Sequence, residues 1–292
     1  MKHLSHMRTA GDDGWLGLAI ICDKDNVGTL RDHAWNLATS YPGYDGHIAS
    51  STTPPAPSAF GNIKELMADF YHQAPAELKR RLLARRHDHG LLECPYCGSP
   101  GKPDTLDHFM PQGTWPEFSI YPNNLVPQCR DCMPVKGERY YCSTRNDALF
   151  LHPVYHDMLA QLAFGIDITM NRGTPTFAIT FSVLKTLDAA DKKRLTTHIA
   201  ELDLQARIVK FCHREYGEWK NQISANRFDI EKTLGACLAI YPAFNAGAAP
   251  NWEAAFYKGV LQNQEFLRHL ESFAPKVART AAPVSAVETL PC

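Results

Sequence analysis

Two pairs of cysteines with the spacing C-x-x-C constrain the fold of this chain more than any other feature of its sequence. The first pair is Cys94 with Cys97, the second is Cys129 with Cys132, and 31 residues separate the pairs. Two thiolates at this spacing can turn onto one metal ion, and four sulfur ligands in a tetrahedral array favour zinc. Because a four-cysteine site leaves no coordination position open, we expect a structural zinc site.

The other cysteines do not suggest a disulfide framework. The chain holds nine cysteines, an odd number, and its first residues lack the pattern of a signal peptide. A redox motif is the main alternative for each pair, but two copies outside a βαβ context do not favour it. Cys142 lies near enough to be a spare ligand. Because no run approaches the roughly 20 apolar residues of a membrane helix, we expect a cytoplasmic protein without membrane contacts.

The first half of the chain predicts helices followed by an irregular segment. Residues 1–90 are expected to form a helical region with a linker near 49–59, where Ser, Thr, Pro and Ala dominate. Apolar periodicity predicts helices over 63–73 and 75–87. Residues 91–146 are rich in Pro, Gly and Asn and hold the cysteine pairs, so a metal ion is expected to stabilise them.

The second half of the chain shows more regular patterns. Residues 147–274 are expected to form an α+β region that begins with a hairpin, its strands over 164–170 and 176–181. Residues 275–292 show little periodicity and predict a loosely held tail. The helices predicted between the hairpin and the tail cover 188–200, 202–224, 227–241 and 251–271.

Between the cysteine pairs, Asp107 stands directly before His108 in the stretch Thr-Leu-Asp-His-Phe-Met-Pro. At the end of a short strand, such a carboxylate can bind a hard divalent cation, and the imidazole can take a proton from water near neutral pH. Pairs of Asp and His are common and mostly structural when they stand alone. This pair is framed by two zinc-type motifs, and Asn124 follows sixteen residues beyond His108, which makes the pattern specific.

The region resembles the HNH endonucleases, a family of ββα-metal nucleases with a subgroup stabilised by zinc. The resemblance covers about residues 92–140, and the order and spacing of its motifs make coincidence improbable. It implies an α+β fold in which a zinc-bound ββα core is flanked by an N-terminal helical region and a C-terminal region of hairpin and helices. The motifs are Cys94-x-x-Cys97, Leu106-Asp-His-Phe-x-Pro111, Asn124-Leu-Val-Pro127, Cys129-x-x-Cys132 and Lys136-Gly137.

The resemblance also implies roles for individual residues. His108 corresponds to the general base that activates water, and Asp107 to a ligand of the catalytic divalent ion, magnesium or manganese. Asn124 corresponds to the residue that pins the loop orienting the histidine. His152 lies in a His-Pro segment similar to one in several stand-alone bacterial HNH proteins, so it is either near this metal or a packing residue. The implied reaction is hydrolysis of DNA phosphodiester bonds.

One position departs from the family pattern. The residue directly after the second cysteine pair, normally His or Asn, is Met133, and a thioether is a poor ligand for magnesium. Three explanations are open: the ion uses Asp107 with water and phosphate oxygens, another side chain replaces the missing ligand, or catalysis is impaired. The candidates for a replacement ligand are His152, His156 and Glu138.

Cationic residues that can contact nucleic acid are concentrated around the cysteine motifs. Five of them lie in the helix predicted over 75–87, where Lys79, Arg80 and Arg86 share one side and can neutralise backbone phosphates. A solvated helix face is the alternative. Lys136 and Arg139 follow the second cysteine pair and are further candidates for phosphate contacts.

The leading interpretation is a metal-dependent DNA endonuclease or nickase, which the resemblance alone connects with bacterial defence against foreign DNA. A partner protein from the same defence system and assembly into a homo-oligomer are both compatible with it. The alternative is a catalytically silent, zinc-stabilised subunit that binds nucleic acid or protein and has lost its catalytic metal through Met133. Because 30 Lys and Arg face 31 Asp and Glu, contact with DNA is expected to be local.

Overall fold

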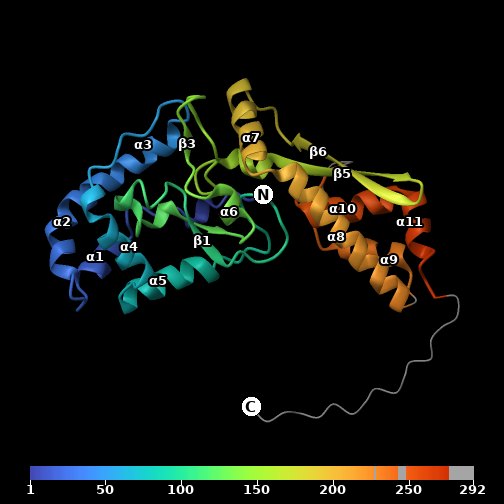
Figure 1. The fold of residues 1–292 in the computed structure, drawn as a ribbon, viewed down its shortest axis with the longest axis horizontal. Helices are drawn as coiled ribbons and strands as arrows, with labels where there is room; N and C mark the ends of the chain where they lie inside the picture. Colours follow the sequence, from blue (N-terminus) through green and yellow to red (C-terminus); the bar gives the residue numbers. More distant parts are fainter. Residues whose placement is uncertain (227, 243–247, 276–292) are drawn as a thin grey trace, which may run out of the picture.

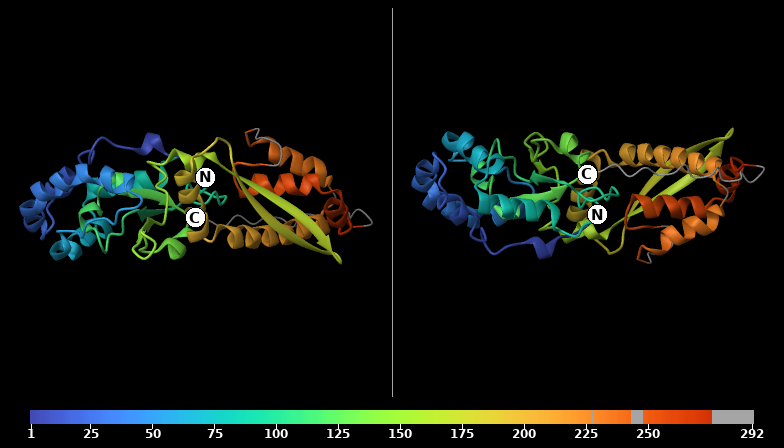
Figure 2. Two further views of the ribbon diagram at one scale, coloured as in Figure 1. Left: turned by 90° about the horizontal axis from the view of Figure 1, so that it is seen from above. Right: turned by 90° about the horizontal axis from the view of Figure 1, so that it is seen from below.

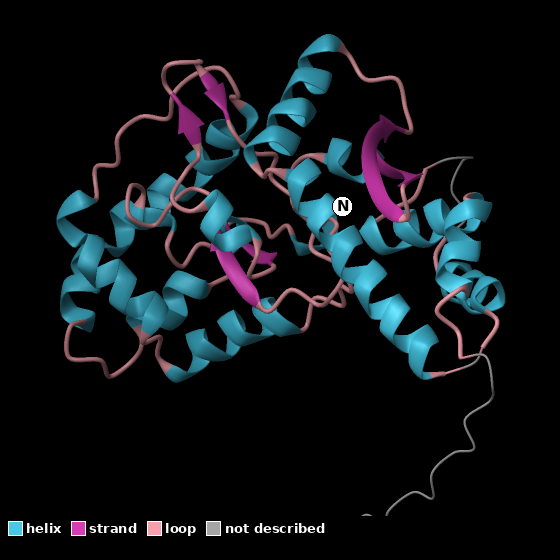
Figure 3. Cartoon of the chain, turned by 45° about the vertical axis from the view of Figure 1, so that its right-hand side comes forward, coloured by secondary structure: helices cyan, strands magenta, loops and turns pink. Residues whose placement is uncertain are grey.

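The computed structural model describes residues 1–226, 228–242 and 248–275, and it shows an α+β fold. Within these residues the strands form three separate antiparallel pairs, and helices make up most of the remaining regular structure (Figure 3). The molecule is elongated: the N-terminal and central segments form one half, and the segments after β5 form the other (Figures 1 and 2). The tail predicted over 275–292 lies outside the described residues except for its first residue.

Five α-helices precede the cysteine motifs. The last two agree with the helices predicted over 63–73 and 75–87. The first three were not predicted individually, because α1 and α3 have only six residues each and α2 buries only Val27, Leu30 and Leu37 of its fourteen. Residues 50–60 contain neither helix nor strand, as expected for the linker. The five helices are α1 (Trp15–Ile20), α2 (Val27–Ser40), α3 (Tyr44–Ala49), α4 (Lys64–His72) and α5 (Ala76–His87).

The central segment contains two short strands and a short helix. Strand β1 (Thr105–His108) pairs antiparallel with β2 (Leu125–Gln128), so that His108 lies opposite Leu125, and α6 (Cys132–Lys136) follows. The order of two strands and a helix is the one that the HNH resemblance implies. A second small pair joins β3 (Tyr141–Cys142) to β4 (Asp147–Ala148).

Short 3-10 turns replace regular structure in much of the central segment and at the joins around it. Prolines at the start of two of them remove backbone donors and disfavour longer elements. The 3-10 turns are η1 (Ser5–Met7), η2 (Tyr41–Gly43), η3 (Gly61–Ile63), η4 (Pro116–Phe118), η5 (Pro122–Asn124) and η6 (Asp157–Gln161).

The hairpin predicted in the C-terminal half is present and longer than expected. Strands β5 (Leu162–Asn171) and β6 (Thr174–Val183) have ten residues each and are joined by Arg172 and Gly173. Both connecting residues have positive φ, 51° and 81°, which is the geometry of a two-residue hairpin turn that suits the twist of the strands.

The helices after the hairpin cover one of its faces and pack on each other (Figures 1 and 2). One helix predicted over 251–271 is two helices, because the side chain of Asn263 accepts a hydrogen bond from the Phe266 backbone and begins a new helix. A Cβ on Gly259 would lie 2.3 Å from the Ile166 carbonyl oxygen, so the close contact with β5 requires glycine. The helices are α7 (Ala189–Glu201), α8 (Leu204–Ala225), α9 (Ile230–Ala239), α10 (Trp252–Gln262) and α11 (Gln264–Glu271).

The two halves share a continuous apolar core and several polar contacts. His198 of α7 donates from Nε2 to the Tyr96 carbonyl at 2.8 Å, and its Nδ1 accepts from the Leu151 backbone at 3.0 Å. The backbones of Phe164 and Ala249 form an isolated antiparallel bridge. Within the described part of the chain, no helix is both long enough and apolar enough to cross a bilayer.

Candidate active site and metal centre

The four cysteines of the two C-x-x-C motifs meet at one point. All four sulfur atoms lie within 4.8 Å of one another; the distance is 4.0 Å between Cys94 and Cys132 and 3.8 Å between Cys97 and Cys129. Zinc–sulfur bonds of about 2.3 Å in a tetrahedron place the sulfurs about 3.8 Å apart. The cluster therefore fits a metal ion such as zinc, and no other such group of three or more ligands occurs among the described residues.

Local backbone geometry and one arginine support this cluster. After Cys97 the chain turns at Gly98, which has a φ of +75° and donates its N–H to the Cys94 carbonyl at 2.8 Å. Arg207 of α8 lies 3.5 Å from the sulfur of Cys132 and 3.8 Å from that of Cys97. Its positive charge offsets part of the negative charge of four thiolates around a divalent ion, as is common for groups that surround metal ligands.

His108 is the last residue of β1, and its hydrogen bond fixes the tautomer of its ring. Its Nε2 lies 2.9 Å from the Ser119 carbonyl oxygen, and because a carbonyl only accepts, Nε2 carries the proton. Nδ1 then holds a lone pair, and no hydrogen bond to it is formed within the described residues. Burial lowers the pKa of His108 to about 4, although the Ser119 carbonyl opposes this. The imidazole is therefore neutral at pH 7, the state that a general base requires.

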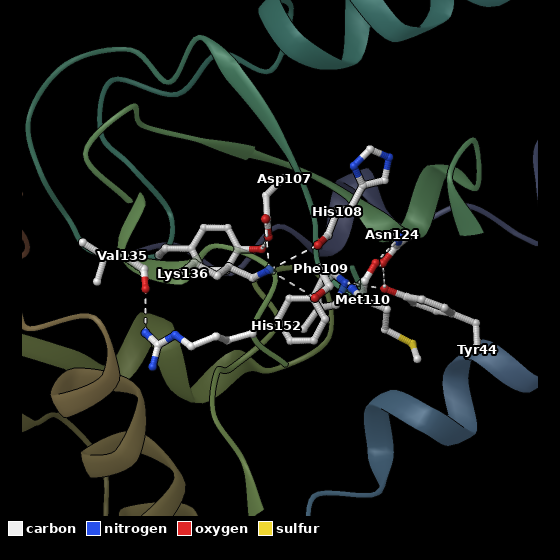
Figure 4. A network of polar contacts seen from close by, with 11 residues as sticks. Tyr44, Asp107, His108, Phe109, Met110, Asn124, Val135, Lys136 and His152 are labelled. Atoms are coloured by element: carbon white, nitrogen blue, oxygen red, sulfur yellow. Dashed lines mark hydrogen bonds and ion pairs between the residues drawn. The ribbon is translucent and has the colours of Figure 1, made fainter. Parts of the chain in front are cut away.

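Asp107 lies on the other side of β1 from His108, because successive side chains of a strand alternate between its faces (Figure 4). Its Oδ1 is 3.0 Å from Nζ of Lys136, and its Oδ2 accepts from the Tyr96 hydroxyl at 2.6 Å. Lys136 is fully buried and also donates to the carbonyls of His108 and Phe109, at 3.1 and 3.2 Å. Asp107 and Lys136 thus form a buried ion pair beneath the strand.

This ion pair corrects two predictions. Lys136 was expected to contact DNA phosphates, but its side chain has no exposed surface. Asp107 was expected to bind the catalytic divalent ion, but both of its oxygens are engaged and it does not line the cavity that His108 lines. A buried lysine requires a partner for its charge, and Asp107 provides it.

Asn124 fastens the loop that follows His108. Its side-chain oxygen accepts from the Met110 backbone at 2.7 Å and from the Tyr44 hydroxyl at 2.9 Å. Its amide group donates to the carbonyls of Met110 and Phe118, at 3.0 and 3.1 Å. Four hydrogen bonds of this fully buried side chain hold Met110, two residues after His108, and Phe118, the residue before Ser119. This is the geometry that a role in orienting His108 requires.

His152 does not lie at the candidate site in a form that could bind a metal ion. Its Nδ1 accepts from the Val154 backbone at 3.1 Å, and its Nε2 faces the Asn123 carbonyl at 3.0 Å and the Tyr44 hydroxyl at 3.1 Å. The ring is fully buried, so both nitrogens are used inside the core. Of the two alternatives for His152, the packing residue is the one that these contacts favour.

A cavity of about 790 Å³ opens beside His108. It is formed between α4, the end of α5, β1 and the start of α6, and Met133 lines it with half of its surface exposed. In its wall, Nε of Arg86 and Nε2 of Gln112 are buried atoms without a hydrogen-bond partner. Both side chains line the cavity, and the Arg86 guanidinium also interacts with Tyr71 in the same wall.

Only one of the cationic residues predicted on α5 lines this cavity. Arg86 does, whereas Lys79 and Arg80 are exposed elsewhere on the helix, and Arg80 pairs with Glu77. Arg139 does not line it either, because its guanidinium forms an ion pair with Glu201 at 2.6 Å beside a different cavity. The basic helix is therefore a weaker phosphate site than its composition indicates.

Several cavity residues do not follow from the sequence motifs. Tyr71 and His72 come from α4, and the Tyr71 ring packs edge-on against His108 with 4.4 Å between ring centroids. Nothing in the sequence indicates this contact, because it joins segments far apart in the chain. Gln112 directly follows Pro111, and Arg130 directly follows Cys129. Their position next to the motifs is the feature from which a place at the site could have been predicted.

Comparison with known proteins gives one similarity and two negative results. The chain is 26% identical over 239 residues to protein ea31 of Escherichia phage lambda; the alignment covers 73% of this chain and 78% of the phage protein. No family model matches the chain, and no solved structure matches it. The similarity extends well beyond the cysteine motifs, so the phage protein resembles more than the central segment of this chain.

Proposed function

We propose that this chain is an HNH-type endonuclease or nickase that hydrolyses DNA phosphodiester bonds in the bacterial cytoplasm, as part of defence against foreign DNA. The observation that carries the proposal is the cavity beside His108. It combines a neutral imidazole whose Nδ1 is available with two buried donors, on Arg86 and Gln112, that have no partner. A base and two phosphate-binding groups in one cavity are what hydrolysis of a phosphodiester needs.

In this proposal the chain's own residues divide the reaction between them. Nδ1 of His108 takes a proton from a water molecule, and the hydroxide attacks phosphorus as the bond to the leaving oxygen breaks. The leaving oxygen takes a proton from solvent water, and His108 returns its proton to solvent. Arg86 and Gln112 line the cavity, and their side-chain nitrogens would bind the non-bridging oxygens, where negative charge accumulates in the transition state. Asn124 and the Ser119 carbonyl keep the His108 ring in the tautomer that exposes Nδ1.

The side chains around the cavity supply few ligands to a magnesium ion, so water and phosphate oxygens would have to supply most of them. Magnesium prefers six oxygen ligands in a nearly octahedral arrangement. Asp107 is engaged by Lys136 and Tyr96, Asp104 pairs with Arg130, and Met133 offers only a thioether. Magnesium or manganese is the ion that the resemblance implies, so both belong in the test of the proposal.

The same observations favour one alternative function. A subunit that has kept the zinc-bound core and lost the catalytic ion would show Met133 in place of a ligand and a carboxylate neutralised by a lysine. Such a subunit would bind DNA or a partner protein without cleaving DNA. For both functions we propose that the four-cysteine site holds one structural zinc ion.

The experiment that tests the proposal is cleavage of supercoiled plasmid by the full chain with Mg²⁺, with Mn²⁺ and with EDTA. We expect nicked circles with at least one of the two metals. His108→Ala should lower the rate by about 10²-fold or more, the range that a general base contributes. Absence of cleavage with both metals would favour the silent subunit, and full activity in His108→Ala would refute the assignment of the base.

Met133→Asn is the informative companion variant. An amide oxygen restores an acceptor of the kind that the family pattern has at this position, so the cleavage rate is expected to stay unchanged or rise. A complete loss of cleavage in a variant that melts like the parent would contradict the view that Met133 is a departure without a role of its own.

A further inference from the structure

Helix α8 places three cationic residues on one side, facing the central segment. Arg207, Lys210 and Arg214 are spaced by three and four residues, so they share one face of the helix. All three line a groove of about 390 Å³, to which the loop before α6 contributes Arg130 and Asp131. Four cations and a single carboxylate line this groove, although Arg130 also pairs with Asp104 and Arg207 contacts the cysteine sulfurs.

The groove adjoins the cavity beside His108. Arg130 and Pro134 line both of them, so the two hollows are neighbours on either side of these residues. An extended ligand that occupies the cavity can therefore pass over Arg130 onto α8. The distance from Arg207 to Arg214 is about 10 Å along the helix axis, at 1.5 Å per residue. This matches about three nucleotides of one strand at 3.4 Å each.

The charges in the groove are available to different degrees. Lys210 is exposed and forms no ion pair with any described residue. Arg214 is 58% exposed, and its ion pairs with Glu215 and Glu218 are long, 3.4 and 3.9 Å. Long ion pairs at an exposed site contribute little, so a phosphate can displace them at small cost. Lys210 and Arg214 are thus the side chains in the groove that are best placed to bind an incoming anion.

The metal cluster fixes the inner end of the groove. Arg207 is held between the sulfurs of Cys132 and Cys97 on one side and the ring of Trp252, 5.6 Å from its centroid, on the other. A bound metal ion would therefore hold α8 against α6 through this arginine. The position of the α8 cations relative to His108 is determined by the same cluster that stabilises the core.

We propose that the groove lined by Arg130, Arg207, Lys210 and Arg214 binds the sugar-phosphate backbone of DNA whose scissile phosphate lies beside His108. This inference rests on the proposed function and extends it, because it assigns the C-terminal half a part in holding the substrate. The aromatic rings at the groove, Phe211 and Trp252, are buried. They offer no face for base stacking, so binding in the groove should depend on the phosphate charge and not on the base sequence.

Binding of a short DNA duplex, measured by fluorescence anisotropy as a function of salt concentration, tests the inference. The full chain carries His108→Ala throughout, so that cleavage does not interfere. In this background Lys210→Gln with Arg214→Gln should raise Kd about tenfold and lower the slope of log Kd against log salt by roughly 2, one for each phosphate that is no longer neutralised. Lys192→Gln with Arg268→Gln removes the same charge from exposed positions outside the groove and should change neither quantity.

Two results would overturn the inference: equal Kd values for the groove variant and its control, or no DNA binding by the full chain. Cleavage assays with His108 intact distinguish this failure from failure of the proposed function. Plasmid cleavage that is unaffected by the groove substitutions would leave the nuclease proposal standing and remove the groove from it. If the chain never cleaves DNA but the groove variant binds DNA more weakly than the control does, the groove would stand as a DNA-binding site and the nuclease proposal would fail.

Discussion

The central segment and the C-terminal half of this molecule are stabilised in different ways. In the C-terminal half, two ten-residue strands and five helices bury apolar faces that are periodic in the sequence. In the central segment β1 and β2 have four residues each and α6 has five. Its geometry depends on the cysteine cluster, the ion pair of Asp107 with Lys136, and the hydrogen bonds of Asn124. Stability is spread over many contacts in one region and concentrated in a few polar groups in the other.

The largest expected effect of a single substitution is at the cysteine cluster. Cys132→Ser removes one of four ligands, and a structural zinc ion contributes on the order of 10 kcal/mol to a small folded unit. We expect about one zinc per chain in the parent and less than half of that in the variant, with loss of the cooperative unfolding of the core. Cys142→Ser is the matched control, because the Cys142 thiol lies beside Thr144 and outside the cluster. Equal zinc contents in the two variants would contradict the four-cysteine site.

The buried ion pair should give the next largest effect. Lys136→Ala leaves the Asp107 carboxylate without its partner in a buried place, which costs about 3–5 kcal/mol of unfolding free energy. The double variant Lys136→Met with Asp107→Asn removes both charges and should recover much of this loss. Denaturant unfolding of the parent and the variants measures both quantities. A loss below about 1 kcal/mol in Lys136→Ala would mean that the pair is not buried as described.

Acid should weaken the contact between the two regions through His198. Burial lowers the pKa of His198 to about 4, below the ordinary value near 6.5. The unfolded chain therefore binds a proton that the folded chain does not, so stability is complete above about pH 6.5 and falls as the pH drops toward 4. His198→Gln should make this fall shallower by at most about 1.4 kcal/mol per pH unit. Parallel slopes for the variant and the parent between pH 6.5 and 4.5 would contradict the buried neutral state.

A helix cap in the C-terminal half should give the smallest effect. The Asp188 carboxylate accepts from the Asp191 backbone at 2.8 Å and begins α7. Asp188→Ala should lower the unfolding free energy by about 1 kcal/mol, the usual contribution of such a cap. A loss as large as that of Lys136→Ala would break the contrast between the regions, because stability in this half would then also depend on single polar groups.

The regular half was largely predictable from the sequence for a physical reason. Helices and hairpins can be predicted from the local periodicity of apolar residues. The turn at Arg172 and Gly173 is indicated by the glycine between two alternating segments. The break at Asn263 was missed because the apolar pattern continues across it from α10 into α11, and only the cap ends one helix there. Helices α1 and α3 were missed because six residues are too few to show a helical period, and α2 because only three of its fourteen residues are buried.

The candidate site was predictable only in part. The cysteine motifs and the place of His108 follow from spacing along the chain, and the structure brings the four sulfurs together. The partners of the charged groups do not follow from spacing. Lys136 has the sequence context of a surface cation, yet it is buried against Asp107, and the cavity also requires Tyr71 and Arg86 from helices that precede the motifs. Long-range packing decides these contacts, and one sequence does not reveal it.

Chemical rescue of DNA cleavage tests the central claim, that the His108 imidazole activates water in its cavity, most directly. The cavity of about 790 Å³ leaves room for a free imidazole once the side chain is removed. His108→Gly should lower the cleavage rate by about 10²-fold or more, and added imidazole should restore part of it in proportion to the neutral form. Retained cleavage in the glycine variant, or a loss that imidazole does not reverse, would contradict the claim.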